Sequence, residues 1–347
     1  MKVGAGGPAA RLVRPSTPAD AAAIASLVGG WPPNVAPEQL AWKYWQTRLA
    51  PLSFVTCEGP AVIAHAGVVA GGCLTDCGRL TLALVIDWAA DPGAAGAGLA
   101  LLKHVGRSFD ALFAVGGSEH TQRILPVAGF ECVGTVTGFV RTLRPWRVLS
   151  DYRRSNWRIL PRLVRSIFWT LSAPSPSVRG WSVRKVGRDS LGGLTAVLPR
   201  PRADLAVMER TPASLAHALE CPTARMELYV AERGHESRGY FLLAFVPGQA
   251  RIADCWAVEP ITEDWAALVQ LAVDTARRDS SVAEIMAWSS DPVMRQALTS
   301  CGFRRRHELP LSLRRSRASD ARIPALRIQL LDSDVAYLHQ GRVELLA

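Results

Sequence analysis

The sequence predicts an α/β protein made of two similar halves, each a mixed sheet flanked by helices. Apolar runs of strand length alternate along the chain with segments of helical periodicity. The same order of elements occurs twice within 347 residues, a length that suits two domains. Both halves place a helix ending in Gly-Phe directly after a buried strand, at Gly129-Phe130 and Gly302-Phe303. The repeat lies in the order of the elements and not in residue identity.

The first half, residues 1–145, is expected to follow the order β-α-α-β-β-β-α-β-α-β. A short strand precedes a helix capped by Thr17 or Asp20, and Pro37 starts a second, aromatic helix. Strands are predicted at 53–57, 61–69 and 80–88. DWAADPGAAGAGLALLKHVG then combines an Asp-Pro turn, three spaced glycines and an apolar helix. ALFAVGGS is a buried strand, EHTQRILPVAGF a helix, and a last strand pair runs to Leu143.

The second half, residues 179–316, repeats this order. WSVRKV is a strand, and two helices follow, in 189–198 and in TPASLAHAL. Three strands come next, then the helix DWAALVQLAVDTARR, the strand VAEIMAW, the helix DPVMRQALTSCGF and the strand RRRHELPLSL. A basic linker, 146–178, joins the halves, and a tail, 317–347, closes the chain.

Composition narrows the classes of function. Hydrophobic residues make up 49% of the chain, and no apolar run reaches membrane-spanning length, so we expect a cytoplasmic protein. The seven cysteines are odd in number and form no CxxC pair, which favours reduced thiols over a disulfide framework or a zinc site. The net charge of +10 favours anionic partners. Nucleic acid is not the expected one, because no zinc finger, RNP-type motif or helix-turn-helix spacing is present.

The strand, Asp-Pro turn, glycine-spaced loop and helix, followed by a strand and a helix ending in Gly-Phe, resemble the GNAT superfamily of acyl-CoA N-acyltransferases. Because both halves match, the chain is similar to tandem-GNAT proteins. The closing LLDSDVAYL is similar to the ends of GNAT-like proteins of bacterial exopolysaccharide gene clusters. The family's loop has Arg or Gln, two residues, Gly, one residue, then Gly or Ala. Here Gly96 and Gly98 match, while Gly93 stands at the Arg or Gln position.

The resemblance implies acetyl-CoA or another acyl-CoA as cofactor. Successive N–H groups of a Gly-rich turn at a helix N-terminus form a concavity that suits a diphosphate. The alternative is that Gly and Ala only permit tight helix-on-sheet packing. The second half has Pro260, Glu263 and Asp264 at this place, which argues against a second diphosphate site. The candidate cofactor-binding residues are Trp88, Ala89, Gly93, Ala94, Ala95, Gly96, Ala97, Gly98, Leu99 and Lys103.

Acyl transfer from a thioester to an amine needs a neutral amine, a stabilised oxyanion and a proton for the leaving thiolate. The resemblance implies a carboxylate base near the fourth strand, where Asp87 is the ionisable residue, and His120 is a second catalytic candidate. The alternatives are a turn-capping role for Asp87 and a solvated helix start for His120. The resemblance implies a Tyr that acts as the general acid, and the positions that correspond to it here are Leu125 and Leu298, both aliphatic.

Four residues are candidates for binding the acceptor. The aromatic helix EQLAWKYWQTRL contributes Trp42 and Tyr44, which could stack on a sugar ring or pack in the core. In the second half, Asp254 occupies the place of Asp87, with Trp256 beside it. Either this pair lines an acceptor pocket, or Asp254 is a buried carboxylate that is hydrogen-bonded to strand ends.

The linker carries a basic amphipathic helix over residues 152–171. Helical spacing puts Trp157, Leu160, Val164, Ile167, Phe168 and Leu171 on one stripe and Arg154, Arg158, Arg162 and Arg165 on another, with a kink at Pro161 allowed. Two interpretations stand. The helix either contacts a membrane surface or packs its apolar stripe on a sheet between the domains.

These features predict an acyl-CoA-dependent N-acyltransferase whose acceptor is a small amine or amino-sugar, with a role in polysaccharide biosynthesis. The alternative is a catalytically degenerate tandem-GNAT module that serves as a binding or peripheral-membrane partner in polysaccharide assembly. The missing loop side chain at Gly93 and the aliphatic Leu125 motivate this alternative.

Overall fold

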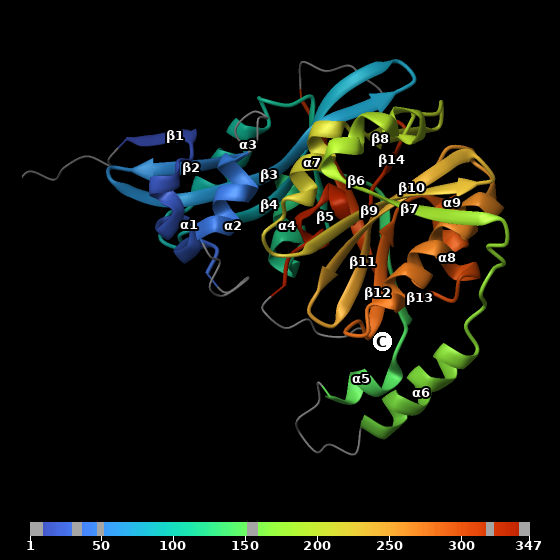
Figure 1. Ribbon diagram of the computed structural model, residues 1–347. Coiled ribbons are helices and arrows are strands. Elements are labelled where there is room, and N and C mark those ends of the chain that lie inside the picture. The colour runs from blue at the N-terminus through green and yellow to red at the C-terminus, as the bar shows by residue number, and fades with distance from the viewer. Residues whose placement is uncertain (1–9, 30–36, 47–51, 151–158, 317–322, 340–347) are drawn as a thin grey trace, which may run out of the picture. The chain divides into compact units, whose positions relative to one another are not determined.

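The computed structural model describes residues 10–29, 37–46, 52–150, 159–316 and 323–339. The chain forms two compact units (Figure 1). Unit 1 contains residues 1–71, 80–132 and 312–321, and unit 2 contains residues 72–79, 133–311 and 322–347. Each unit is a mixed sheet flanked by helices, which confirms the expected α/β class.

Unit 1 has the strand order β1-β2-β3-β4-β5, followed by the end of β13. Helix α1 packs its Ile24 on Val55 and Cys57 of β2, which form a small buried cluster. Its elements are β1 (Arg11–Pro15), α1 (Ala21–Leu27), α2 (Pro37–Leu40), the π-helical turn η2 (Ala41–Trp45), β2 (Ser53–Glu58), β3 (Ala61–Thr75), β4 (Gly78–Ala90), α3 (Ala97–Val105), β5 (Ala111–Val115) and α4 (Glu119–Val127).

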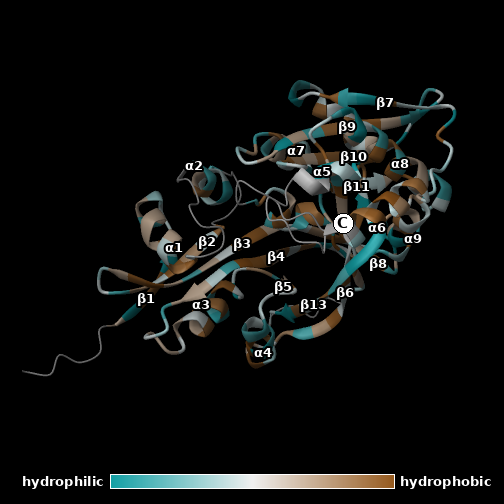
Figure 2. Cartoon of the chain, turned by 90° about the horizontal axis from the view of Figure 1, so that it is seen from below, coloured by the Kyte–Doolittle hydropathy of each residue, from teal (hydrophilic) through white to brown (hydrophobic). Residues whose placement is uncertain are grey.

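Unit 2 has the order β13-β6-β12-β11-β10-β9-β7. Strand β10 is hydrophobic over most of its length (Figure 2), and β11 is buried throughout, as expected for strands covered on both faces. Its elements are β6 (Glu131–Thr142), α5 (Pro145–Ser150), α6 (Ile159–Leu171), β7 (Trp181–Val186), η3 (Arg188–Val197), β8 (Leu205–Met208), α7 (Pro212–Leu219), β9 (Arg225–Arg233), β10 (Glu236–Val246), β11 (Gln249–Ala257), α8 (Thr262–Arg278), β12 (Glu284–Ser289), α9 (Pro292–Ser300), β13 (Arg304–Arg315) and β14 (Ala325–Arg327).

The units do not follow the two halves of the sequence. Strand β6, the last of the first half, pairs antiparallel with β12 from Thr142↔Glu284 to Thr137↔Ser289. The end of β13, the last strand of the second half, belongs to unit 1, where the Ser316 N–H donates to the Asp110 carbonyl at 2.8 Å. Each half therefore contributes residues to the other unit.

The described part of the helix expected at 152–171 is helical, since α6 spans Ile159–Leu171. Residues 151–158 lie outside the described residues, and helix α5 precedes them. Pro161 is the third described residue of α6, and the kink allowed there stays a prediction. Within the described ranges, no helix is both long enough and apolar enough to cross a bilayer.

Candidate functional site

The candidate site of unit 1 lies where β4 and β5 part. These strands pair in parallel at Leu82↔Ala111, Ala83↔Leu112 and Leu84↔Phe113. Strand β4 continues to Ala90 after the last of these pairs. The C-terminal half of β4 therefore has one edge that β5 does not cover, and the glycine turn and α3 follow directly.

The glycine turn at residues 91–98 is built by local hydrogen bonds. Asp91 accepts from the Gly93 N–H through its side chain at 2.7 Å and from the Ala94 N–H through its carbonyl at 2.9 Å. Gly96 has φ +76°, which an L side chain rarely adopts, and caps α3. The N–H groups of Ala95, Gly96, Gly98 and Leu99 have no backbone acceptor in the described part of the chain. The turn thus presents several donors at a helix N-terminus.

Packing accounts for the last glycine of the turn. A Cβ at Gly98 would lie 3.2 Å from Trp88 Nε1 and 3.2 Å from the Cβ of Ala90. The Trp88 indole N–H donates to the Gly98 carbonyl at 3.0 Å. Gly98 therefore serves the close approach of α3 to β4, while Ala95 and Gly96 remain exposed. Packing therefore accounts for the missing side chain at Gly98 and leaves Ala95 and Gly96 without such an explanation.

A cation from β1 contacts this turn, while Lys103 is exposed in the last turn of α3. The Arg11 side chain, from β1, donates to the Ala95 carbonyl at 3.0 Å. Arg11 is separated from the turn by 84 residues, so no sequence spacing indicates it. Its guanidinium also lies 3.6 Å from Glu58, so the positive charge that it brings to the turn is partly balanced.

Asp87 has a strained backbone. Among the described residues other than glycine, Asp87 is the one with a positive φ, at +44°. Such a conformation persists only where surrounding contacts hold it. His65 Nδ1 lies 2.8 Å from the Asp87 carbonyl oxygen, and Ser53 Oγ lies 2.8 Å from His65 Nε2. A carbonyl can only accept, so Nδ1 carries the proton and Nε2 accepts from Ser53.

A chain of hydrogen bonds continues from His65 through Ser53 and Ser16 to Trp45. Ser16 donates to Ser53 Oγ at 2.6 Å, and the Trp45 indole donates to Ser16 Oγ at 3.1 Å. Burial lowers the pKa of His65, which is fully buried, so the imidazole is neutral. His65 thus holds the strained carbonyl of Asp87 without adding a charge.

The Asp87 carboxylate is held by a cation and a phenol. Lys43 Nζ lies 2.6 Å from Asp87 Oδ2, and the Tyr44 hydroxyl donates to the same oxygen. Burial raises the pKa of Asp87, but Lys43 and Tyr44 outweigh it and the net shift is downward. Oδ1 makes no hydrogen bond with the described residues. The carboxylate is therefore ionised, with one oxygen open to a further donor.

Tyr44 and Trp42 are buried, with exposed fractions of 3% and 6%. A Cβ at Gly67 would collide with the Tyr44 ring, so this glycine makes room for it. The Tyr44 hydroxyl reaches Asp87, but neither aromatic presents an open ring face in this structure. His120 lies exposed in the first turn of α4, whose cap is Ser118, and makes no hydrogen bond to a described residue. The structure does not join His120 to Asp87.

In unit 2, Asp254 and Trp256 lie in a closed polar network. Asp254 is 1% exposed and accepts from Arg210 at 2.8 Å and from the Tyr240 hydroxyl. Trp256 packs edge-on against Trp265, and the Arg327 guanidinium lies 4.6 Å from both rings. Both candidates are thus enclosed, as in the alternative of a buried, bonded Asp.

The C-terminal tail fills the end of the splay between β11 and β12. These strands pair from Gln249↔Glu284 to Ile252↔Ala287 and then part. Gln329 of the tail bonds both main-chain groups of Cys255, at 3.0 and 3.1 Å, and donates to Asp254 at 2.6 Å. Ile328 bonds Ser290, just after β12, through its N–H at 2.8 Å. Residues 326–329 thus bridge the two strands where unit 1 has its candidate site.

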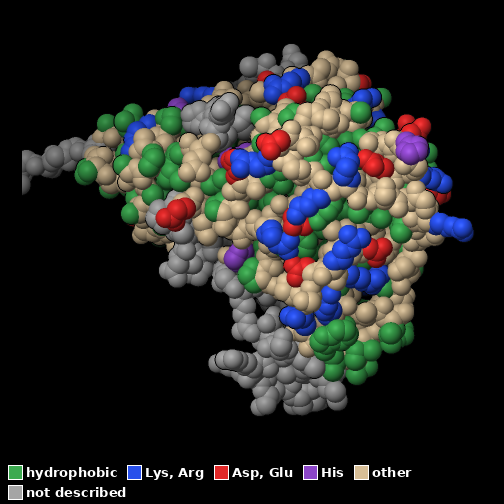
Figure 3. Space-filling model, in the orientation of Figure 1, with side chains coloured by type: hydrophobic (Ala, Val, Ile, Leu, Met, Phe, Trp, Pro, Cys, Tyr) green, Lys and Arg blue, Asp and Glu red, His purple; other side chains and the backbone are tan. Residues whose placement is uncertain are grey.

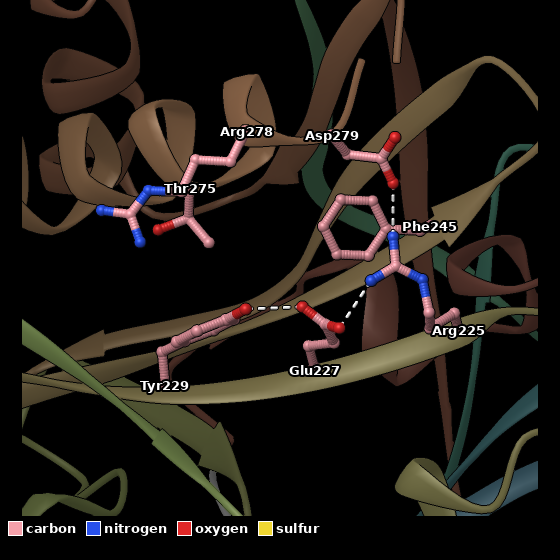
Figure 4. Close-up of a pocket in the computed structure, with 7 residues that line it drawn as sticks. All are labelled: Arg225, Glu227, Tyr229, Phe245, Thr275, Arg278 and Asp279. Atoms are coloured by element: carbon pink, nitrogen blue, oxygen red, sulfur yellow. Dashed lines mark hydrogen bonds and ion pairs between the residues drawn. The ribbon is translucent and has the colours of Figure 1, made fainter. Parts of the chain in front are cut away.

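Unit 2 also has a cavity of about 520 Å³ beside α8 (Figure 4). Arg225 lies between Glu227 and Asp279 and pairs with both, and the Tyr229 hydroxyl donates to Glu227. Lys185 also pairs with Glu227, at 2.7 Å. The carboxylates of the cavity are therefore already neutralised by neighbouring cations.

Comparison with known proteins supports the fold. No family model matches the sequence, and no curated protein matches it. A GCN5-related N-acetyltransferase from Anabaena variabilis ATCC 29413 is 12% identical with a TM-score of 0.56, over 88% of this chain and 72% of that one. One from Kribbella flavida is 15% identical with a TM-score of 0.54, over 88% and 71%.

A tandem GNAT protein from the clavulanic acid biosynthesis pathway, solved without AcCoA, is 13% identical with a TM-score of 0.51. The match covers 90% of this chain and 100% of that one. At these identities the comparison establishes the fold. The tandem GNAT fold implied by the sequence resemblance is confirmed.

Proposed function

We propose that unit 1 is an acyl-CoA-dependent N-acyltransferase that acylates a small amine. The observation that carries the proposal is the pairing of two features on one strand. The edge of β4 that β5 leaves uncovered ends in a turn where four N–H groups have no backbone acceptor among the described residues. The same strand carries an ionised carboxylate whose Oδ1 makes no hydrogen bond with a described residue. The fold likeness to N-acetyltransferases supports it.

The residues at the turn fit an acyl-CoA. The N–H groups of Ala95, Gly96, Gly98 and Leu99, at the positive end of the α3 dipole, would hold its diphosphate. Lys103 and Arg11 would add positive charge, and the edge of β4 at Trp88 and Ala89 would bind the pantetheine arm. The cofactor supplies a thioester-activated acyl group.

Asp87 would orient the acceptor. Its lowered pKa makes the carboxylate a weak base, which favours a role other than the expected base. Oδ1 can accept a hydrogen bond from the incoming amine and stabilise the positive charge that develops on nitrogen. Lys43 and Tyr44 fix the carboxylate, and His65 fixes its backbone.

Thermal shift with CoA and acetyl-CoA tests the cofactor site. Ligand at a hundredfold excess over Kd should raise Tm by roughly 5–10 °C. Release of free thiol from acetyl-CoA is then measured with polyamines, amino acids and amino-sugars. Turnover with amino-sugars alone would support the role in polysaccharide biosynthesis. No shift at millimolar CoA would contradict the proposal.

A degenerate binding module is the second candidate. Leu125 stands where the family has the Tyr that acts as general acid, and it is a buried aliphatic residue. Water would have to protonate the leaving thiolate, whose ordinary pKa of about 8.5 makes this feasible. A melting shift without thiol release for any amine would favour this candidate over the transferase.

A further inference from the structure

Helix α6 of the linker exposes an apolar stripe. Val164, Ile167, Phe168 and Leu171 follow the spacing i, i+3, i+4, i+7 and therefore share one face of the helix. Their exposed fractions are 58, 39, 63 and 82%. Trp146 of the neighbouring helix α5 is 64% exposed. The hydrophobic residues of α6 form a patch in Figure 3.

The opposite face of α6 is the buried one. Ser166 is fully buried, and its hydroxyl has no hydrogen-bond partner among the described residues. Helix α6 packs against α5. A surface helix of a globular protein normally buries its apolar face and exposes its polar one. Here the order is inverted, so the stripe packs on no sheet within the described residues.

The segment that carries the stripe is also strongly basic. Residues 144–171 contain seven arginines and one aspartate, which is a net charge of +6 out of the chain's +10. They also contain three tryptophans, one tyrosine and one phenylalanine. Arg165 lies over the Trp169 ring at 4.7 Å. Cationic and aromatic side chains thus accompany the exposed aliphatic ones.

We infer that α5 and α6 dock on an anionic lipid surface. A helix lying in a bilayer interface needs apolar side chains on one face and Lys or Arg beside them, which this segment supplies. The thirteen described residues of α6 extend over about 20 Å, which is sufficient for the helix to lie in the plane of a bilayer interface.

Charge and hydrophobicity together favour lipid over other partners. A nucleic acid would engage the arginines and aromatics but would leave Val164, Ile167 and Leu171 in water. A second copy of the chain would bring one +6 segment against another, which is electrostatically unfavourable. The inference stands on the linker alone and does not depend on the proposed acyl transfer.

Flotation of the full-length protein tests the inference. The probes are vesicles of phosphatidylcholine and phosphatidylglycerol in a three-to-one ratio, and vesicles of phosphatidylcholine alone. Wild type should float with the mixed vesicles and remain in solution with the neutral ones. Binding should fall as salt is raised, because the surface potential is screened.

Two variants separate the apolar from the electrostatic part. Phe168→Ser with Leu171→Ser should weaken partition at least about tenfold, with Val127→Ser and Ile261→Ser as control, since both are exposed outside the segment. Arg154→Gln, Arg158→Gln and Arg162→Gln together should weaken it roughly a hundredfold. Arg304→Gln, Arg305→Gln and Arg306→Gln, also exposed, are the matched control. Circular dichroism checks that every variant is folded.

Three results would overturn the inference. Equal flotation with neutral and anionic vesicles would show that lipid charge plays no part in binding and would contradict an anionic lipid surface as the partner. A wild-type dimer that the Phe168 and Leu171 variant loses, without vesicle binding, would assign the stripe to self-association. Binding of single-stranded RNA that only the arginine variant loses, again without vesicle binding, would assign the segment to nucleic acid.

Discussion

The Lys43 amine lies 2.6 Å from Asp87 Oδ2, with only 8% and 11% of the two side chains exposed. Two opposite charges removed from water in this way must compensate each other, because either one alone would be costly to bury. The Tyr44 hydroxyl shares the same oxygen. The pair therefore fixes the direction of the second oxygen, Oδ1, on which the proposed orientation of the amine depends.

Asp87→Asn should lower kcat at least about a hundredfold and leave the Kd for CoA unchanged, because the diphosphate donors are on a different segment. Stopped assays of thiol release and calorimetric titration with CoA measure the two effects. Asp254→Asn is the matched control, since this buried carboxylate also bonds a cation and a tyrosine. An equal loss of kcat in both variants, corrected for the folded fraction, would make the role of Asp87 structural.

Gly93→Arg should tighten CoA binding by roughly fivefold to tenfold, since it restores a cation at the anion-binding turn. Gly93 is exposed and has no positive φ, and a Cβ there would lie 3.2 Å from Asp91 Oδ1, so the Asp91 side chain must shift slightly to admit an arginine. Gly193→Arg in unit 2 adds the same charge at an open position and should leave the affinity unchanged. Equal gains in both variants would show a general charge effect and argue against a diphosphate at the turn.

CoA should bind once per chain, because Gln329 occupies the main-chain groups of Cys255 in unit 2. Calorimetric titration of the full chain measures the stoichiometry. Gln329→Ala should lower the free energy of unfolding by about 2–3 kcal/mol, since it leaves the Cys255 N–H and one contact of Asp254 unsatisfied. Two equivalent CoA sites in the wild type would contradict the tail's role in closing unit 2.

The Arg14–Asp20 pair should make unit 1 sensitive to acid. The hydrogen bond from Arg14, at 2.7 Å, is the main cause that lowers the pKa of Asp20 to about 2. The resulting stability, about 2 kcal/mol, is complete above the unfolded pKa and is lost as pH falls through the folded pKa. Urea unfolding of wild type and Asp20→Asn should show this difference at pH 7 and about half of it at pH 3. A pH-independent difference would mean that the pair adds no charge-dependent stability.

Much of the fold could be predicted because its signals are local. The apolar run of β10 and the turn at Gly96 each depend on residues close in sequence. The tandem organisation could be predicted because the same order of such local patterns occurs twice along the chain. Two short strands, β8 and β14, escape this approach because their partners are distant in sequence. β14 pairs with β8 between residues 325–327 and 205–207, and β8 also pairs with β3.

The candidate site was predictable only in part. An isolated Asp87 on an apolar strand indicates that some cation must approach it, but not that Lys43 does. Likewise, the place of Asp254 beside Trp256 suggested an acceptor pocket, while the tail closes it through Gln329. Such partners are set by contacts between segments far apart in the chain.

The sequence by itself determined the order of strands and helices, the glycine turn and the excess of positive charge, because periodicity, backbone conformation and composition act over neighbouring residues. Tertiary structure alone decided which faces are covered. It buried Ser166 and exposed Phe168 on α6, ionised Asp87 through Lys43, and placed Gln329 against Cys255. Burial and ion pairing depend on which distant segments meet, and no local pattern specifies that meeting.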